Sequence, residues 1–398
     1  MTRPPFEVAD IIRQHGTRFI EAHRAWLTAQ HLRVLRAIAH CRTAALGGHL
    51  DRCAACGHRA ISFNSCRNRH CPKCLTHARN EWLEEREREL LPVGYAHVVF
   101  TLPHALAVLA LQNKRVVYDL LFQASAATLL EVARTSKHLG AALGFLSVLH
   151  TWGQTLLHHP HVHCVVPAGG LSPDGQRWVH ARPSFFLPVN VLSRVFRGKF
   201  VAGLRAAFRA GRLTMPKDLQ RLTTEPAFAA WLRTLFRHEW IVYAKPPFGG
   251  PSHVLHYLAR YTHRVAISNH RLVAVADGHV TFRWKDYRHG SQVRLMTLSA
   301  EEFLRRFCLH VLPKGFVRIR FYGFLAPRCR TDALPRCRQA LDANPPPPVP
   351  VASTGATSTR VPLPPCPACG GVMGAVERLT GRQLALHTFI NGLALDSS

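Results

Sequence analysis

The period of hydrophobic and polar positions changes several times along the chain, and each change predicts an element. Patterns with helical spacing predict helices at 18–45, 76–91, 104–136, 190–211, 217–237, 252–264 and 301–311. Short runs rich in apolar residues predict strands at 96–102, 144–152 and 161–167, and a three-strand meander at 271–275, 279–284 and 292–297. Because a polar turn at 158–160 separates two of these strands, we expect them to form a hairpin.

The order of these elements predicts the fold class. Helices and strands alternate irregularly, so we expect an α+β fold with a central, largely antiparallel sheet flanked by helices. The stretch 340–365 is rich in Pro, Ser and Thr and cannot build an apolar core, so we interpret it as a flexible linker. We therefore expect an N-terminal domain over 1–92, a main domain over 93–330 with a helical insertion at about 190–240, and a short tail over 366–398.

The net positive charge of the chain indicates which class of molecule it binds. The chain has 51 Lys and Arg against 23 Asp and Glu, a net charge of +28. Such an excess destabilises a compact protein unless a polyanion neutralises it, which favours nucleic acid as the partner. We expect no membrane partner, because we find no stretch of about 18 apolar residues. The N-terminus lacks the apolar core of a signal peptide, so we expect a cytoplasmic protein with reduced thiols.

The cysteines indicate a metal site. Twelve cysteines placed at random would give roughly 0.4 pairs spaced Cys-x-x-Cys. The chain has three such pairs: Cys53/Cys56, Cys71/Cys74 and Cys366/Cys369. The first two pairs are separated by fourteen residues, a spacing that predicts one tetrahedral, four-thiolate structural Zn²⁺ site in a small N-terminal zinc-binding domain. The residues left open as substitute ligands are His58, Cys66 and His70.

Two further features are a basic loop, which separates the first two cysteine pairs, and the third cysteine pair itself. Arg67 and Arg69 lie between the first two cysteine pairs in a basic loop that is suited to phosphate contacts. The third pair, Cys366/Cys369, stands alone in the sequence. It could complete a second site with Cys329 and Cys337, or be half of a site or a dimer contact.

A second candidate metal site lies in the predicted strand at 161–167. His161 and His163 are two residues apart, so on a strand they face the same side and can bind one divalent metal ion. Val162 between them would face the core. With 26 histidines in the chain, this spacing is close to chance, so its meaning depends on what the metal would act on.

Two tyrosines supply a candidate nucleophile for that metal. Tyr257 and Tyr261 are four residues apart on a predicted helix, which places both phenols on one face, next to the cationic Arg260 and Arg264. A phenol is a poor nucleophile at neutral pH, but it can attack a phosphodiester when a divalent metal stabilises the developing charge. The product is a covalent phosphotyrosine that keeps the bond energy for rejoining. Two tyrosines permit two successive strand transfers.

Taken together, these residues resemble the insertion-sequence-91 family, the two-tyrosine HUH transposases, over most of residues 10–375. The motifs that carry the resemblance, besides the tyrosine helix, are SCRNRHCPKC at 65–74, FTLPH at 100–104, TWGQ at 151–154, HPHVH at 159–163, FRWKDY at 282–287 and LPKGF at 312–316.

The resemblance implies a nuclease fold with a central antiparallel sheet, a Mg²⁺ or Mn²⁺ cofactor and single-stranded DNA at element ends and target. It implies rolling-circle-like transposition through a 5′-phosphotyrosine, with His161 and His163 as metal ligands and Tyr257 and Tyr261 as nucleophiles. It also implies a bacterial, nucleoid-associated protein and leaves the oligomeric state open. For a third metal ligand we favour Gln154, on the strand next to the histidines; the rivals are His253 and His256.

Two other functions fit part of the sequence. A replication initiator or relaxase would use the same chemistry at another origin, but the chain has no Walker-type nucleotide-binding loop for the helicase common in large initiators. A non-enzymatic zinc-finger DNA-binding protein would explain the charge and cysteines, but not the His and Tyr pairs. Trp284 and Lys285 are a candidate contact for single-stranded DNA, with the packing of a strand end on the sheet as the alternative.

Overall fold

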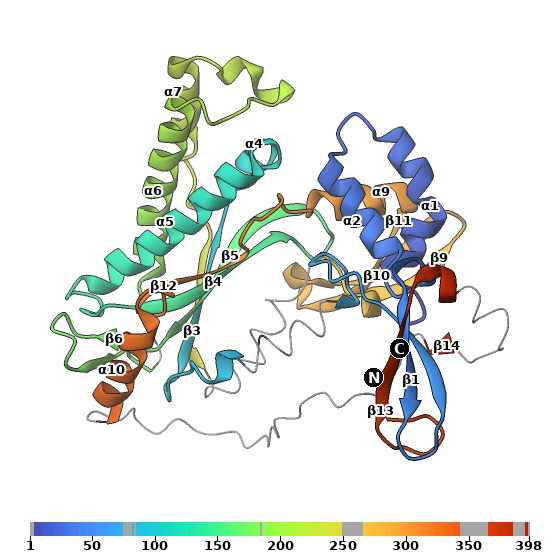
Figure 1. Ribbon diagram of the computed structural model, residues 1–398. Helices are drawn as coiled ribbons and strands as arrows, with labels where there is room; N and C mark the ends of the chain where they lie inside the picture. The colour runs from blue at the N-terminus through green and yellow to red at the C-terminus, as the bar shows by residue number, and fades with distance from the viewer. Residues whose placement is uncertain are drawn as a thin grey trace. The chain divides into compact units, whose positions relative to one another are not determined.

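The computed structural model describes residues 4–74, 82, 85–183, 185–248, 266–342, 365–384 and 395–396 (Figure 1). The chain forms two compact units, each built from separate segments. Unit 1 comprises 1–80, 263–311 and 355–398, and unit 2 comprises 81–262 and 312–354. We expected residues 263–311 in the main domain and 366–398 as a separate tail, but both segments are grouped with the N-terminal residues. The expected linker falls largely on 343–364, outside the described residues.

Three helices form one part of unit 1: α1 (Val8–Ala22), α2 (Ala29–Ala39) and α9 (Ala300–Leu309). The single helix expected over 18–45 is therefore wrong. The chain breaks before α2 because Thr28 caps it, its side chain accepting a hydrogen bond from the backbone amide of His31. The His31 ring is 3.2 Å from the carbonyl oxygen of Cys308 in α9, so α2 is bonded to a helix almost 280 residues away in sequence.

The predicted meander is confirmed in unit 1. Strands β9 (Leu272–Ala276), β10 (His279–Asp286) and β11 (Gln292–Ser299) pair antiparallel in the order β11-β10-β9. Asp277 and Gly278 both have positive φ, as the tight turn between β9 and β10 requires. Val280 and Phe282 alternate into the core, where the Phe282 ring lies 6.0 Å from that of Phe303 in α9.

A second sheet of unit 1 pairs strands from the N-terminal part of the chain with strands from the C-terminal part. Strands β1 (Gly48–Cys53) and β2 (Arg59–Phe63) form a hairpin, flanked by β13 (Met373–Leu379) and β14 (Leu395–Asp396), in the order β13-β1-β2-β14. Strand β13 runs antiparallel to β1 and places Met373 opposite Cys53. The C-terminal segment is therefore an edge of the N-terminal sheet.

Unit 2 is built on one five-stranded sheet in which every neighbouring pair is antiparallel. Its strands, in spatial order, are β12 (Ile319–Gly323), β4 (Gly144–Trp152), β5 (His158–Pro167), β3 (Tyr95–Thr101) and β8 (Val242–Phe248). The expected hairpin is present as β4 and β5. The α+β fold with a central antiparallel sheet flanked by helices is thus confirmed.

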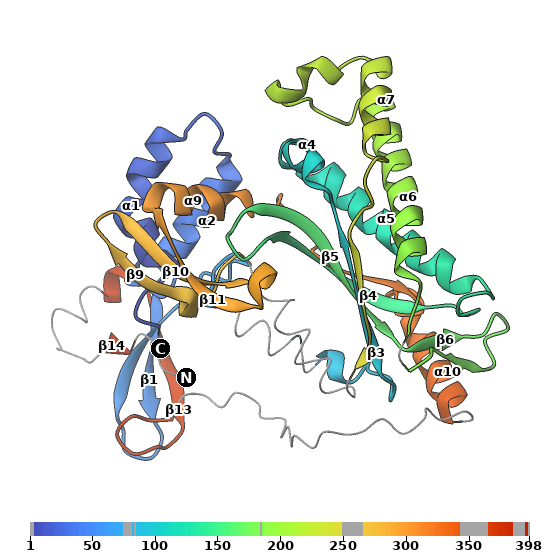
Figure 2. The same cartoon turned by 180° about the vertical axis from the view of Figure 1, so that it is seen from behind.

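Helices cover one face of this sheet. Helices α5 (Lys114–Arg134) and α6 (Val189–Arg209) lie along the same side in both views (Figures 1 and 2), with α4 (Ala107–Gln112) and α7 (Glu225–Thr234) beside them. Val162, Cys164 and Val166 of β5 point into the core under these helices. The odd-numbered residues of β5 therefore face the other side of the sheet.

That other side has its own, smaller cover. Val165 packs there with Trp178 of the hairpin β6 (Gly169–Leu171) and β7 (Trp178–His180), and with Leu334 of α10 (Arg330–Asp342). Short 3₁₀ turns complete the described chain at Ala44–Leu46, His104–Leu106, Lys217–Leu222, Asn269–Arg271 and Tyr287–His289.

Among the residues that the structure describes, α5 is the one helix long and apolar enough to cross a membrane. Two thirds of its apolar window (67%) is buried inside unit 2. Tyr118, Leu121, Phe122 and Leu129 of this helix are fully buried against the sheet and α6. Its apolar composition is therefore explained by its place as a core helix.

Candidate active site and metal centres

Three histidines meet on the face of the unit 2 sheet opposite α5 and α6. His161 and His163 lie two apart on β5, and His150 on β4 is paired directly with His161. The ring nitrogens of the three residues lie within 4.8 Å of one another. Antiparallel pairing of β4 with β5 thus adds a third imidazole to the predicted pair, and the three can hold one divalent metal ion.

Hydrogen bonds orient two of these rings. Nδ1 of His161 is 2.7 Å from the carbonyl oxygen of His159, so it carries the proton and leaves Nε2 as the ligand atom. Nδ1 of His163 lies 2.8 Å from Nε2 of His97 on β3, and the two rings stack within 7° of parallel. His97 is thus placed to hold His163 with its Nε2 toward the cluster, as partners of metal-binding histidines commonly do.

Two histidines of the cluster, His161 and His163, and the neighbouring His97 are held in their neutral form. Burial, with repulsion from His159, lowers the pKa of His161 to about 3. Burial, with repulsion from Lys245, lowers the pKa of His97 to about 4. Burial also lowers the pKa of His163 well below the ordinary value for histidine. Neutral imidazoles bind a cation without first losing a proton, so the site needs no proton release near neutral pH.

These shifts predict that acid destabilises unit 2. A histidine whose folded pKa is depressed gives stability that is complete above its unfolded pKa, about 6.5, and lost as pH falls toward the folded value. His97 alone should cost about 3 kcal/mol at pH 4. The protection factors of the amides in β3, β4 and β5, taken relative to the intrinsic exchange rate at each pH, should fall between about pH 6.5 and 4.5, above the range of ordinary carboxylates. Exchange protection that stays constant over this window would contradict the shifts.

The structure adds His150, which we did not predict, to the predicted histidine pair. Gln154 lies in the turn after β4, whereas His150 lies within β4 and its ring centre is 4.3 Å from that of His163. The feature that could have revealed His150 is the cross-strand register of the predicted hairpin, which pairs position 150 with position 161. The nucleophile candidates and their neighbours, Tyr257, Tyr261, Arg260, Arg264, His253 and His256, lie outside the described residues.

The four cysteines expected to share one zinc are divided between two clusters, which corrects that grouping. Cys71 and Cys74 meet Cys41 and Cys66, all four sulfurs lying within 4.8 Å of one another. The Cys74 sulfur is 3.5 Å from that of Cys41 and 3.6 Å from that of Cys66. Thiolates at about 2.3 Å from a tetrahedral Zn²⁺ would be about 3.8 Å apart, so this cluster fits structural zinc.

The other predicted pair, Cys53 and Cys56, is joined by Cys366 and Cys369. The expected partners of the C-terminal pair, Cys329 and Cys337, lie elsewhere, in and just before α10 of unit 2. The physical reason is that β13 pairs with β1 and carries the C-terminal pair to the hairpin tip. Strand pairing between segments more than 300 residues apart leaves no local signal in the sequence.

The residues proposed to contact DNA in unit 1 differ in exposure. Arg67 is exposed and has a positive φ, while Arg69 is half-buried, and burial lowers its pKa. Trp284 and Lys285 are consecutive on β10 and therefore point to opposite faces of the meander. Lys285 shares the exposed face with Arg283, whereas Trp284 lies on the face of Val280 and Phe282, so Trp284 and Lys285 do not form a joint cluster.

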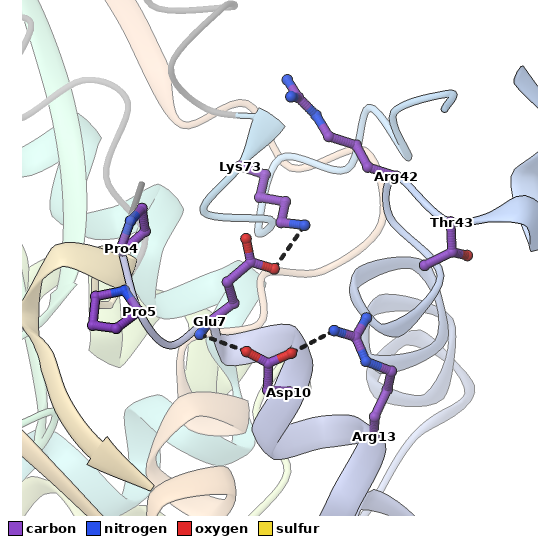
Figure 3. A pocket seen from close by; sticks show the side chains of 8 residues that line it. All are labelled: Pro4, Pro5, Glu7, Asp10, Arg13, Arg42, Thr43 and Lys73. Carbon is purple, nitrogen blue, oxygen red and sulfur yellow. Dashed lines mark hydrogen bonds and ion pairs between the residues drawn. The ribbon is translucent and has the colours of Figure 1, made fainter. Parts of the chain in front are cut away.

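A pocket of about 430 Å³ lies beside the first cysteine cluster (Figure 3). It is lined by Pro4, Pro5, Glu7, Asp10, Arg13, Arg42, Thr43 and Lys73. Figure 3 shows its charges turned toward one another: Lys73 is 2.6 Å from Glu7, and Arg13 is 2.5 Å from Asp10. The Lys73–Glu7 pair holds the loop that carries Cys71 and Cys74 against the start of α1, and the Arg13–Asp10 pair lies within α1. The pocket is thus a structural feature of unit 1.

Comparison with known proteins finds two family matches and two similar proteins. A family profile described as "Transposase zinc-binding domain" matches residues 11–102, and one described as "Putative transposase" matches residues 144–333. "Putative transposase y4qJ" of Sinorhizobium fredii is 57% identical over 348 residues, 87% of each chain. The "Transposase for insertion sequence element IS801" of Pseudomonas savastanoi pv. phaseolicola is 31% identical over 316 residues, 78% of this chain and 74% of the relative. No solved structure matches the chain.

Proposed function

This chain belongs to the insertion-sequence-91 family of transposases, and from that premise we propose that it nicks and rejoins single-stranded DNA at element ends through a covalent 5′-phosphotyrosine. The observation that carries the proposal is the histidine cluster. Three imidazoles, two of them buried and one half-buried, converge on one point of the sheet, as a catalytic divalent metal requires. We propose His150, His161 and His163 as its ligands.

The ligand set suggests which metal serves best. Imidazole nitrogen suits transition metals, whereas Mg²⁺ prefers oxygen ligands. With three histidines we expect Mn²⁺ to support activity at lower concentration than Mg²⁺. When bound, the metal would polarise the scissile phosphate and stabilise the charge that develops on it.

The protein's own part is to supply the nucleophile and hold the DNA. A phenol oxygen of Tyr257 or Tyr261 attacks phosphorus and loses its proton, and the bond from phosphorus to the 3′-oxygen breaks. The 3′-oxygen leaves as a hydroxyl after taking up a proton, and the 5′-phosphate stays on the tyrosine. Attack by a 3′-hydroxyl reverses the step and rejoins DNA, so the second tyrosine can serve a second strand transfer.

The direct test is adduct formation on single-stranded oligonucleotides that carry the left and right element ends. With Mn²⁺ we expect a protein–DNA adduct that survives denaturing electrophoresis, and none with a chelator or with the same sequences as duplex. Adducts on an origin sequence but not on element ends would favour a replication initiator or relaxase. Binding without adduct on every end would favour a non-enzymatic zinc protein and contradict the proposal.

The net charge of +28 predicts that DNA binding is strongly salt-dependent. Binding that neutralises about six phosphates of a single strand should weaken at least about 100-fold between about 50 and about 200 mM salt. Fluorescence anisotropy with the Tyr257→Phe, Tyr261→Phe double variant measures binding free of covalent trapping. A Kd that does not change over this range would show that phosphate contacts are not the main source of affinity.

A further inference from the structure

Two cysteines of the hairpin formed by β1 and β2 and two that precede β13 form a compact cluster: Cys53, Cys56, Cys366 and Cys369. The sulfur of Cys53 lies 3.5 Å from that of Cys369, and the sulfur of Cys56 lies 3.6 Å from that of Cys366. All four sulfurs lie within 4.8 Å of one another. These separations are too long for disulfides, whose sulfurs are about 2.0 Å apart, and are close to the edges of a tetrathiolate zinc site.

The two cysteine pairs lie in turns with the same backbone design. The backbone amide of Cys53 donates a hydrogen bond to the carbonyl oxygen of His58 at 2.8 Å. The backbone amide of Cys366 donates in the same way to the carbonyl oxygen of Gly371, also at 2.8 Å. In each turn the glycine after the second cysteine donates a hydrogen bond from its backbone amide to the carbonyl oxygen of the first cysteine. These bonds run from Gly57 to Cys53 and from Gly370 to Cys366. Both glycines have positive φ, 73° and 75°. Two separate segments thus form matching turns that aim their sulfurs at one point.

Glycine also keeps space open between the sulfurs. A side-chain carbon placed on Gly371 would lie 3.1 Å from the sulfur of Cys53 and 3.3 Å from that of Cys369. Any larger residue would therefore press on two of the four sulfurs.

We propose that Cys53, Cys56, Cys366 and Cys369 bind a second structural zinc ion, which fastens the C-terminal segment to the N-terminal sheet. The zinc-binding family match ends at residue 102, so it assigns no role to Cys366 or Cys369. The proposal concerns a site separate from the histidine cluster and is independent of the proposed DNA chemistry.

Packing explains why this sheet needs a metal. Five of the seven residues of β13 are exposed, and only Met373 and Leu379 are buried. Cys56 and Cys366 are 310 residues apart, so holding them together opposes a large loop-closure entropy. A metal crosslink can supply the binding free energy that offsets this entropy, which so small an apolar contact does not supply. Unit 1 therefore depends on a segment more than 300 residues away along the chain, and a chain truncated before residue 366 would lack half of this site.

The first test is the zinc content of purified full-length protein in which His161 and His163 are replaced by Ala, so that the histidine cluster contributes no zinc. We expect two zinc ions per chain, one after replacing Cys366 and Cys369 together with Ser, and one after replacing Cys71 and Cys74 together with Ser. Cys329→Ser is the matched control, since this half-buried cysteine lies outside both clusters, and it should keep two. One zinc in this parent protein, or two after Cys366 and Cys369 are replaced in it, would overturn the proposal.

A second measurement needs no variant and therefore does not depend on a mutant folding. Cys56 and Cys369 are exposed, so as free thiols they should be alkylated rapidly. Mass spectrometry should show both protected in the purified protein and reactive once a chelator removes the metal, while the rate at Cys329 stays unchanged. Equal alkylation of Cys369 before and after chelation would overturn the second site.

Discussion

Replacing Tyr257 and Tyr261 together with Phe should abolish the covalent protein–DNA adduct, while each single replacement should leave adduct formation at the remaining tyrosine. The phenol oxygen is the proposed nucleophile, and Phe removes only that oxygen, so binding of single-stranded DNA should be unchanged. Denaturing electrophoresis measures the adduct, and anisotropy with the same oligonucleotide measures the binding.

Tyr287→Phe is the matched control for this pair. Tyr287 is 65% exposed and follows β10 in unit 1, so losing its hydroxyl should cost little stability and leave the adduct intact. An adduct that persists in the Tyr257→Phe, Tyr261→Phe double variant would show that another side chain attacks the phosphate, and it would remove the proposed role of the tyrosine helix.

Replacing His161 or His163 with Ala should slow adduct formation by about 1,000-fold or more at fixed Mn²⁺. Metal stabilisation of a phosphoryl transition state is worth several kcal/mol, and each 1.4 kcal/mol is a factor of ten in rate. Single-turnover kinetics over a Mn²⁺ titration separate weaker binding from slower chemistry. Mn²⁺ should raise the Tm of the wild type and not that of the variants.

His150→Ala and Gln154→Ala decide the third ligand. We expect His150→Ala to raise the Mn²⁺ concentration needed for half-maximal rate strongly, and Gln154→Ala to change it little. The reason is position, because His150 lies on β4 directly opposite His161, whereas Gln154 lies in the turn beyond the strand. A larger shift for Gln154→Ala would make Gln154 the third ligand and leave His150 with a packing role.

Much of unit 2 and of the meander could be predicted because periodicity is a local signal. The strands at 96–102, 144–152 and 161–167 appear as β3, β4 and β5, close to their expected bounds. His161 and His163 share a face because alternation along a strand is fixed by geometry. His150 was missed because its proximity depends on the register between two strands, which the turn length and bulges set.

The cysteine partners could not be predicted, for a different reason. A thiol carries no directional pattern in sequence, and the spacing of two Cys-x-x-Cys pairs does not say whether they meet. Cys41 comes just after α2, outside any such pair, and Cys366 reaches Cys56 only through pairing of β13 with β1. The same long-range pairing explains why the expected tail is part of unit 1.

The central claim is that this transposase makes a metal-dependent 5′-phosphotyrosine, and labelling each end of one oligonucleotide tests it most directly. With Mn²⁺, label at the 3′ end should become attached to the protein, while label at the 5′ end should leave as a shorter fragment with a 3′-hydroxyl. Peptide mapping should then place the DNA on Tyr257 or Tyr261. Attachment of the 5′-labelled fragment instead, or cleavage in the presence of Mn²⁺ with no attached DNA, would contradict the claim.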